Sequence, residues 1–201
     1  MKNILITLFF LFSSICGHAQ SAKALFMKGL SFNVLEDYPN AIKEFTKVLT
    51  LVPDSAEAFY ERGYALFKLK KYADALPDFD KAILNNSNLA EAFRKRGLCK
   101  DALGNFESAL KDFNNALKLN TYLNDGYLDR GIVKYKMNDF KGAIEDLDLA
   151  IETDSAEGKA YLVRGMAKSK LMHEKDGCDD WQKAKGLGNL DVPSLIKKHC
   201  K

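Results

Sequence analysis

The chain of 201 residues is poor in the side chains that build metal sites and nucleophile–base pairs. It has three histidines and four cysteines, and it contains neither an HExxH nor a CxxC motif. A glycine-rich phosphate-binding loop is missing as well. We therefore expect no enzymatic activity, no metal, no cofactor and no small-molecule substrate.

An excess of one charge and proline-rich segments are also missing. Lys and Arg total 30 against 27 for Asp and Glu, and a net charge of +3 is too small to indicate a dedicated nucleic-acid binder. Only four prolines occur, 47% of the residues are hydrophobic, and no stretch is of low complexity. The composition indicates a folded protein and no nucleic-acid partner.

A hydrophobic run long enough for a membrane-spanning helix, about 20 residues, is not found. The longest run covers residues 4–15, after one early lysine and before two small residues, in "MKNILITLFFLFSSICGHAQ". This order is typical of a secretory signal peptide. We expect residues 1–19 to be removed after Ala19, leaving a periplasmic or secreted protein. An uncleaved signal anchor is one alternative. A lipoprotein signal at Cys16 is another, but the bulky Ile15 stands where such signals have a small residue.

What the chain does have is a repeat of 34 residues. The stretch "FYERGYALFKL", residues 59–69, reads as a helix although glycine in a helix costs about 1 kcal/mol relative to alanine. The same glycine recurs at Gly29, Gly63, Gly97, Gly131 and Gly165. Five units follow without gaps: 22–55, 56–89, 90–123, 124–157 and 158–191. A tail, 192–201, completes the chain.

Small and large residues keep fixed places within each unit. A second small column is Ala41, Ala75, Ala109, Ala143 and Gly177, and a large column sixteen residues after the glycine is Phe45, Phe79, Phe113, Leu147 and Trp181. These spacings predict two amphipathic helices and a short turn in each unit. We expect the glycine to be retained because it lets large neighbours fill a close helix contact.

The period and the alternation of small and aromatic columns resemble the tetratricopeptide repeat (TPR), over residues 22–191. The resemblance implies an all-α protein: a right-handed α-solenoid of antiparallel helix pairs, in which first helices line a concave groove that binds proteins. The family's tryptophan column holds Leu, Phe or Tyr here, and its unit-ending proline survives only as Pro53. The tail, 192–201, is expected to be a capping helix.

The family's groove positions lie on the first helix of each unit. Carried onto this chain they are Phe26, Leu30, Tyr60, Tyr64, Phe67, Arg94, Leu98, Leu128, Ile132 and Tyr135. We expect an apolar segment of a partner to dock across units two to four, with four of them as aromatic anchors (Tyr60, Tyr64, Phe67 and Tyr135) and Arg94 giving polarity. The alternative is that these side chains only pack between units.

Receptors for the acidic tails of heat-shock chaperones use lysine and asparagine at these positions. The corresponding residues here include Phe26, Leu30, Glu61 and Lys95. The set is not reproduced, and a chaperone-tail receptor is therefore disfavoured.

A basic residue precedes each glycine, and an acidic residue follows the glycine fifteen residues later. The pairs are Lys28/Glu44, Arg62/Asp78, Arg96/Asp112, Arg130/Asp146 and Arg164/Asp180. A recurrence in every unit favours a structural ladder between helices over a ligand site.

Cysteine spacing predicts a closure of the C-terminal end. A turn through "GLGN" would bring the tail helix back along the last helix of unit five, so we expect a disulfide between Cys178 and Cys200. Two buried thiols are the alternative, and Cys99 is expected to stay unpaired. Asp125 and Asp129 share a helix face, which an exposed acidic stripe explains as well as a metal site does. Pro77 falls inside a predicted helix, where we expect a tolerated kink.

Two functions follow from these observations. The first is a binding module that holds a peptide or partner protein in its groove, in the cell envelope or outside the cell. The second is a structural component of an envelope assembly that associates through the ends of the solenoid, with Lys197, Lys198 and Lys201 near a surface or an acidic partner.

Overall fold

The computed structural model describes residues 20–123, 125–154, 158–171 and 173–200, and their regular structure is entirely helical. The chain divides after Cys99 into two compact parts, which we call the first and the second half. The predicted signal peptide, residues 1–19, lies outside the described residues. Within the described part, no helix is both long and apolar enough to span a membrane.

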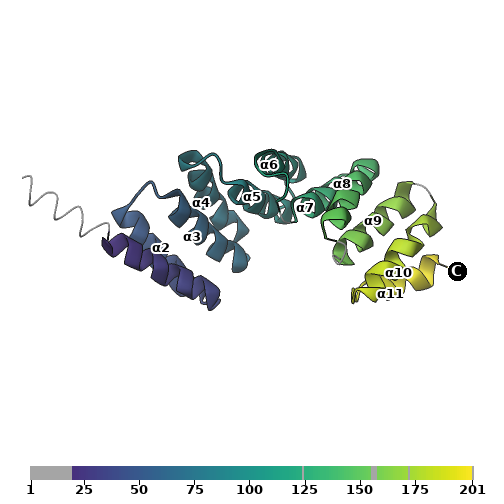
Figure 1. Ribbon diagram of the computed structural model, residues 1–201, viewed down its shortest axis with the longest axis horizontal. Coiled ribbons are helices and arrows are strands. Elements are labelled where there is room, and N and C mark those ends of the chain that lie inside the picture. The colour runs from purple at the N-terminus through teal and green to yellow at the C-terminus, as the bar shows by residue number, and fades with distance from the viewer. Residues whose placement is uncertain (1–19, 124, 155–157, 172, 201) are drawn as a thin grey trace, which may run out of the picture. The chain divides into compact units, whose positions relative to one another are not determined.

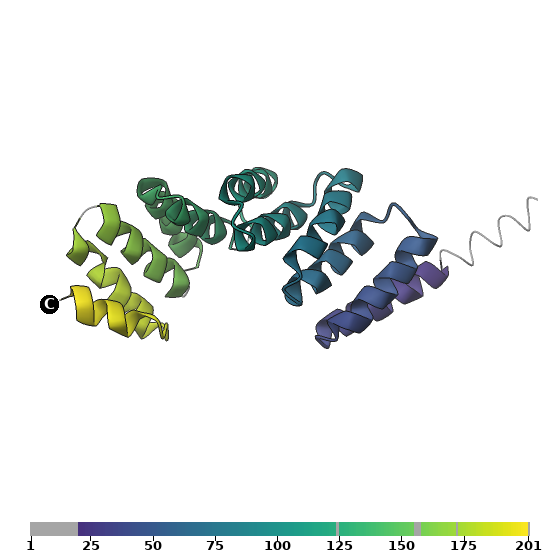
Figure 2. The same cartoon turned by 180° about the vertical axis from the view of Figure 1, so that it is seen from behind.

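Helices follow one another in pairs (Figures 1 and 2). The first half holds a helix over residues 20–34, α2 (Tyr38–Leu51), α3 (Ala56–Lys68), α4 (Tyr72–Asn85) and most of α5 (Ala90–Ala102). The second holds α6 (Phe106–Leu119), α7 (Gly126–Lys136), α8 (Phe140–Thr153), α9 (Gly158–Leu171), the 3-10 helix η1 (Glu174–Gly177), α10 (Cys178–Gly186) and α11 (Val192–His199). In the first half α3 packs on both α2 and α4, and in the second half consecutive helices pack on each other from α6 to α11, which confirms the predicted all-α architecture of tandem pairs.

The glycine column lies at close helix contacts. A Cβ atom on Gly63 would lie 3.1 Å from the Phe79 ring, and one on Gly131 would lie 2.9 Å from Leu147 Cγ. The large side chains that follow the glycines by sixteen residues are all buried: Phe45, Phe79, Phe113, Leu147 and Trp181. A Cβ atom on Gly29 or Gly165 would likewise lie 2.6 Å from Phe45 or Trp181. The explanation for a glycine inside these four first helices is therefore confirmed, because packing outweighs helix propensity there.

The turn inside a helix pair has a backbone feature that also repeats every 34 residues. Glu36, Lys70, Gly104 and Asn138 all adopt the left-handed conformation, with φ between 58° and 80°. Gly104 and Asn138 belong to types that adopt this conformation readily, but Glu36 and Lys70 do not, so at those two positions the packing of the two helices imposes the turn.

Pro77 lies inside α4 without ending it. Proline removes the hydrogen bond to the carbonyl four residues earlier, here that of Ala73. Both residues are exposed, so water can bind the released carbonyl oxygen. This exposure explains why the helix tolerates proline at that point.

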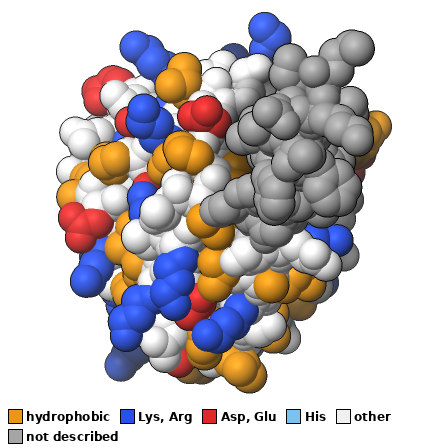
Figure 3. All heavy atoms as spheres, turned by 90° about the vertical axis from the view of Figure 1, so that its left-hand side faces the viewer, with side chains coloured by type: hydrophobic (Ala, Val, Ile, Leu, Met, Phe, Trp, Pro, Cys, Tyr) orange, Lys and Arg blue, Asp and Glu red, His pale blue; other side chains and the backbone are white. Residues whose placement is uncertain are grey.

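Seen from the N-terminal side, apolar, basic and acidic side chains are intermixed over the part of the surface that is not grey (Figure 3). That visible face is an ordinary solvated surface.

Candidate partner-binding site

An open hollow lies between α3 and α5, which are the first helices of two neighbouring pairs in the first half of the chain. Its lining consists of Tyr60, Glu61, Tyr64, Glu91 and Lys95, and we call it the α3/α5 hollow. Tyr60 and Tyr64 are four residues apart and so share one helix face. Both are half-buried, which leaves part of each side chain available to a ligand.

A lysine reaches across the hollow from α5 to α3. Its ammonium nitrogen lies 5.8 Å from the ring centroid of Tyr64 and 5.8 Å from that of Phe67. A cation over an aromatic face is attracted by the ring quadrupole. Lys95 thus places a positive charge beside two rings at one side of the hollow.

The polar groups of the hollow are partly desolvated. Burial, with the nearby carboxylates of Glu91 and Glu61, raises the pKa of Tyr60 far above its usual value, so its hydroxyl stays neutral. Burial also raises the pKa of Glu61, and the hydrogen bond that Asn33 Nδ2 donates to Glu61 Oε2 at 2.9 Å opposes this shift. A ligand would therefore meet a neutral phenol and a carboxylate that is already held by Asn33.

Two of the aromatic anchors predicted from the sequence, Tyr60 and Tyr64, line the hollow, and Tyr60 and Phe67 also pack on other rings. Tyr60 lies 6.1 Å from Phe79 between ring centroids, and Phe67 lies 5.7 Å from Tyr72. Arg94 is buried, and its Nη1 donates to Glu91 Oε2 at 3.4 Å. The expected source of polarity is thus buried at this site, and Lys95 lines the hollow in its place.

The other predicted groove residues lie in separate clusters. Phe26 and Leu30 pack with Phe45 at the first helix pair, whereas Leu98 is half-buried on α5. In the second half of the chain, Leu128 is part of the buried core, and two other predicted groove residues pack against that core, Ile132 and Tyr135. Tyr135 lies 5.6 Å from the Phe140 ring.

Four of the five charged pairs, those with both residues in one half of the chain, form the predicted contact. Arg62 donates to both oxygens of Asp78 at 2.8 and 2.7 Å, and Arg130 does the same to Asp146 at 2.8 and 2.6 Å. Two further pairs repeat the contact, Arg164/Asp180 and Lys28/Glu44. Arg96 lies in the first half of the chain and Asp112 in the second. Asp112 accepts a hydrogen bond from Lys100 at 2.7 Å.

The structure adds a second bond that sequence reasoning missed. Each arginine of the column also reaches a polar residue sixteen positions earlier, on the preceding pair: Thr46, Asp80, Asn114 and Asp148. It also lies over the ring three positions earlier: Phe59, Phe93, Tyr127 and Tyr161. The polar residue at the same spacing in each unit was the available signal. The column therefore joins successive helix pairs, as the structural interpretation requires.

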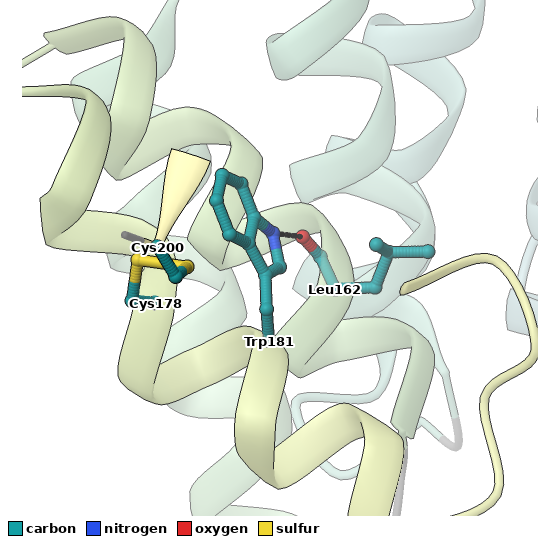
Figure 4. Close-up of a disulfide and its surroundings, with 4 residues drawn as sticks. All are labelled: Leu162, Cys178, Trp181 and Cys200. Atoms are coloured by element: carbon teal, nitrogen blue, oxygen red, sulfur yellow. Dashed lines mark hydrogen bonds between the residues drawn. A yellow bond between two sulfur atoms is a disulfide. The ribbon is translucent and has the colours of Figure 1, made fainter. Parts of the chain in front are cut away.

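At the C-terminal end, Cys178 and Cys200 are joined by the expected disulfide, with their Cα atoms 5.7 Å apart. Trp181 lies beside it and donates from Nε1 to the carbonyl oxygen of Leu162 at 3.3 Å (Figure 4). Cys99 is a free, buried thiol, and burial raises its pKa to about 12. The thiol at Cys99 is thus held in its unreactive protonated form.

The acidic pair before and in α7 differs from its expected arrangement. Asp125 is exposed, but Asp129 is buried, so the exposed-stripe interpretation is wrong for Asp129. Among the described residues, no group of three or more His, Cys, Asp or Glu side chains is placed to hold a metal ion.

Two sequence models of the family described as Tetratricopeptide repeat match residues 26–88 and 90–122. A search of curated proteins finds no significant match.

Solved structures similar to the chain include MamA from Desulfovibrio magneticus RS-1, with 18% identity, a TM-score of 0.77, and coverage of 84% of this chain and 95% of that one. YrrB, a TPR protein with an unusual peptide-binding site, has 17% identity, a TM-score of 0.76, and coverage of 93% and 95%. The first TPR of Spaghetti (RPAP3), bound to the HSP90 peptide SRMEEVD, has 28% identity, a TM-score of 0.57, and coverage of 59% and 94%.

Proposed function

Because the chain is a tetratricopeptide repeat protein, we propose that it is a non-enzymatic interaction module that binds a peptide or protein partner through the α3/α5 hollow. The observation that carries this proposal is the pair of half-buried tyrosines, Tyr60 and Tyr64, beside Lys95 in an open hollow between two first helices. Rigid, half-exposed aromatic side chains provide large contact area at low entropic cost, and such residues dominate binding energies.

The lining favours a partner segment that combines apolar side chains with polar groups. Tyr60 and Tyr64 supply apolar surface and hydroxyl groups, whereas Glu61 and Glu91 oppose the charge of Lys95. A purely acidic tail would meet two carboxylates in the hollow, which is unfavourable. The peptide SRMEEVD bound by the Spaghetti domain is rich in acidic residues, so we propose a different ligand class for this chain.

We further propose that the protein acts in the cell envelope or outside the cell. The signal-like residues 1–19 and the disulfide between Cys178 and Cys200 support this location, because structural disulfides persist in oxidising compartments. In the alternative function, the protein would be an assembly component that associates through the ends of its repeat array.

A photo-crosslinking phenylalanine in place of Tyr64 tests the binding site directly. We expect it to form an adduct with the partner in the native envelope fraction, since position 64 lines the hollow. The matched control is the same substitution at Tyr122, a tyrosine that is 87% exposed outside the hollow.

The affinity of the identified partner is then measured for Tyr64→Ala. Loss of this aromatic side chain of the hollow should weaken binding by about tenfold or more, while Tyr122→Ala should leave it unchanged. If Tyr64→Ala keeps its circular dichroism spectrum and its full affinity, the α3/α5 hollow is not the binding site.

A further inference from the structure

The last helix, α11, covers an apolar surface formed by α9 and α10. Leu162, Trp181 and Ala184 are buried there together with Val192 of α11. We call the part of this surface contributed by α9 and α10 the α11 seat. It comprises Tyr161, Leu162, Met166, Cys178, Trp181 and Ala184. Leu195 and Ile196 of α11 pack against it.

The helix that fills the seat is amphipathic. Its apolar positions, Val192, Leu195, Ile196 and Cys200, follow the spacing i, i+3, i+4 and i+8, which puts them on one face. Lys197 and Lys198 are exposed. The occupant thus contacts the seat through its apolar stripe and keeps its charges in water.

Three features bear on the release of α11: its length, the turn before it and the disulfide at its far end. It has eight residues, and a helix this short is not stable in water without tertiary contacts. It follows a turn in which Gly188 has a φ of +83°, and its far end is fastened to α10 by the disulfide. Loop-closure entropy for a 22-residue separation is about 3 kcal/mol, or about 150-fold in the ratio of seated to released α11.

We propose that the disulfide between Cys178 and Cys200 locks a helix-binding site, which opens on reduction and accepts an amphipathic helix of a partner protein with the apolar spacing of α11. The occupant is identified by the helix that fills the seat now. This site is separate from the α3/α5 hollow, so each stands or fails independently.

The redox step is a thiol–disulfide exchange with a dithiol reductant. A thiolate of the dithiol attacks one sulfur of the protein disulfide and forms a mixed disulfide, and the second thiol of the reductant then displaces the protein sulfur. Two electrons and two protons pass to the protein, which leaves with two thiols. The reductant leaves as a disulfide.

Release of α11 is measured by tryptophan fluorescence. Trp181 is the single tryptophan of the chain and is 1% exposed, so uncovering it should shift its emission to longer wavelength. We expect this shift when dithiothreitol reduces the full chain, and also in Cys200→Ser without reductant. Cys99→Ser is the matched control, because Cys99 lies outside the seat, and it should respond to reductant as the wild type does.

Opening of the seat is measured with a labelled peptide of residues 190–199, LDVPSLIKKH. By fluorescence anisotropy, we expect it to bind the reduced chain and Cys200→Ser at least tenfold more tightly than the oxidised chain. A peptide carrying Leu195→Asp and Ile196→Asp should not bind, since it lacks the apolar stripe.

Three results would overturn the proposal. One is unchanged Trp181 emission after complete reduction. Another is equal or absent binding of the wild-type peptide in the two redox states. The third is a loss of helical circular dichroism larger than α11 accounts for, in both the reduced wild type and Cys200→Ser, which would mean that the bond holds the fold rather than one helix.

Discussion

At the scale of single residues, the protein depends on positions where a side chain is absent. A Cβ atom on Gly165 would lie 2.6 Å from Trp181 Nε1 and 2.9 Å from the carbonyl oxygen of Gly177. The second contact is with backbone, which cannot rotate away. The glycine column is therefore a packing requirement of the helix pairs and not a feature of turns.

We expect Gly165→Ala to lower the free energy of unfolding by about 2 kcal/mol, because overpacking a tight contact outweighs the gain in helix propensity. Gly186→Ala is the control: a Cβ atom at that helical position meets nothing within 4 Å, so stability should stay the same or rise by up to about 1 kcal/mol. Urea denaturation followed by circular dichroism measures both. Equal effects of the two changes would contradict the packing explanation.

The acidic residues of the ladder are the second feature at this scale. Asp146 is 2% exposed and bonds Arg130 and Lys134, whereas Asp80 is an exposed acceptor for Arg96. Removing a buried partner leaves charges uncompensated, and removing an exposed one does not.

Asp146→Ala should therefore lower the free energy of unfolding by about 3 kcal/mol, and Asp80→Ala by less than about 1 kcal/mol. The two variants remove the same chemical group from second helices, Asp146 from the buried column of the ladder and Asp80 from the exposed position two residues further along the repeat, so they compare a buried partner with an exposed one. Thermal unfolding at low and high salt provides the measurement. A ladder role would be refuted if Asp146→Ala kept its melting temperature but lost partner binding.

At the scale of elements, α4 is a helix that its sequence weakens. Pro77 sits in its interior on the exposed side, and Pro39 sits in the first turn of α2. A proline in the first turn removes an N–H that has no helical partner, whereas an interior proline removes a formed hydrogen bond. The same residue type thus has different consequences in the two helices.

Pro77→Ala should raise the free energy of unfolding by about 1 kcal/mol or more, because the hydrogen bond to Ala73 forms and the alanine propensity is better. Pro39→Ala should change it little. Melting temperatures compared by circular dichroism decide the matter. If Pro77→Ala were neutral, water at the Ala73 carbonyl would compensate fully for the missing bond.

At the scale of the whole molecule, the maturation state determines which thiols remain. Removal of residues 1–19 deletes Cys16 and leaves the disulfide of Cys178 and Cys200 with the buried Cys99. The mature chain should then carry a single free thiol.

We expect intact-mass analysis of the exported protein to show Gln20 as its first residue, and alkylation under denaturing, non-reducing conditions to label one cysteine per chain. The solution mass should correspond to a monomer with an accessible hollow. A chain that retains residues 1–19 would favour a membrane anchor. A stable oligomer that dissociates on deletion of residues 192–201 would favour the assembly function.

The sequence by itself determined what repeats within one unit. The helix pairs, the close contacts at the glycines, the buried large column, the Arg62/Asp78 type of pair and the disulfide partners all follow from spacing. Apart from the disulfide, which occurs once, these contacts join residues sixteen positions apart within one helix pair, so the same chemical pattern appears once in each repeat. Periodicity records such contacts directly.

Only the tertiary structure decided how side chains from successive pairs meet. It buried Arg94, placed Lys95 over the rings of Tyr64 and Phe67, and gave the arginine column its second partners. It also imposed a left-handed turn at Lys70, which the residue type does not favour. These outcomes depend on the angle and distance at which one helix pair stacks on the next, and that geometry results from the packing of many side chains together rather than from any single column of the repeat.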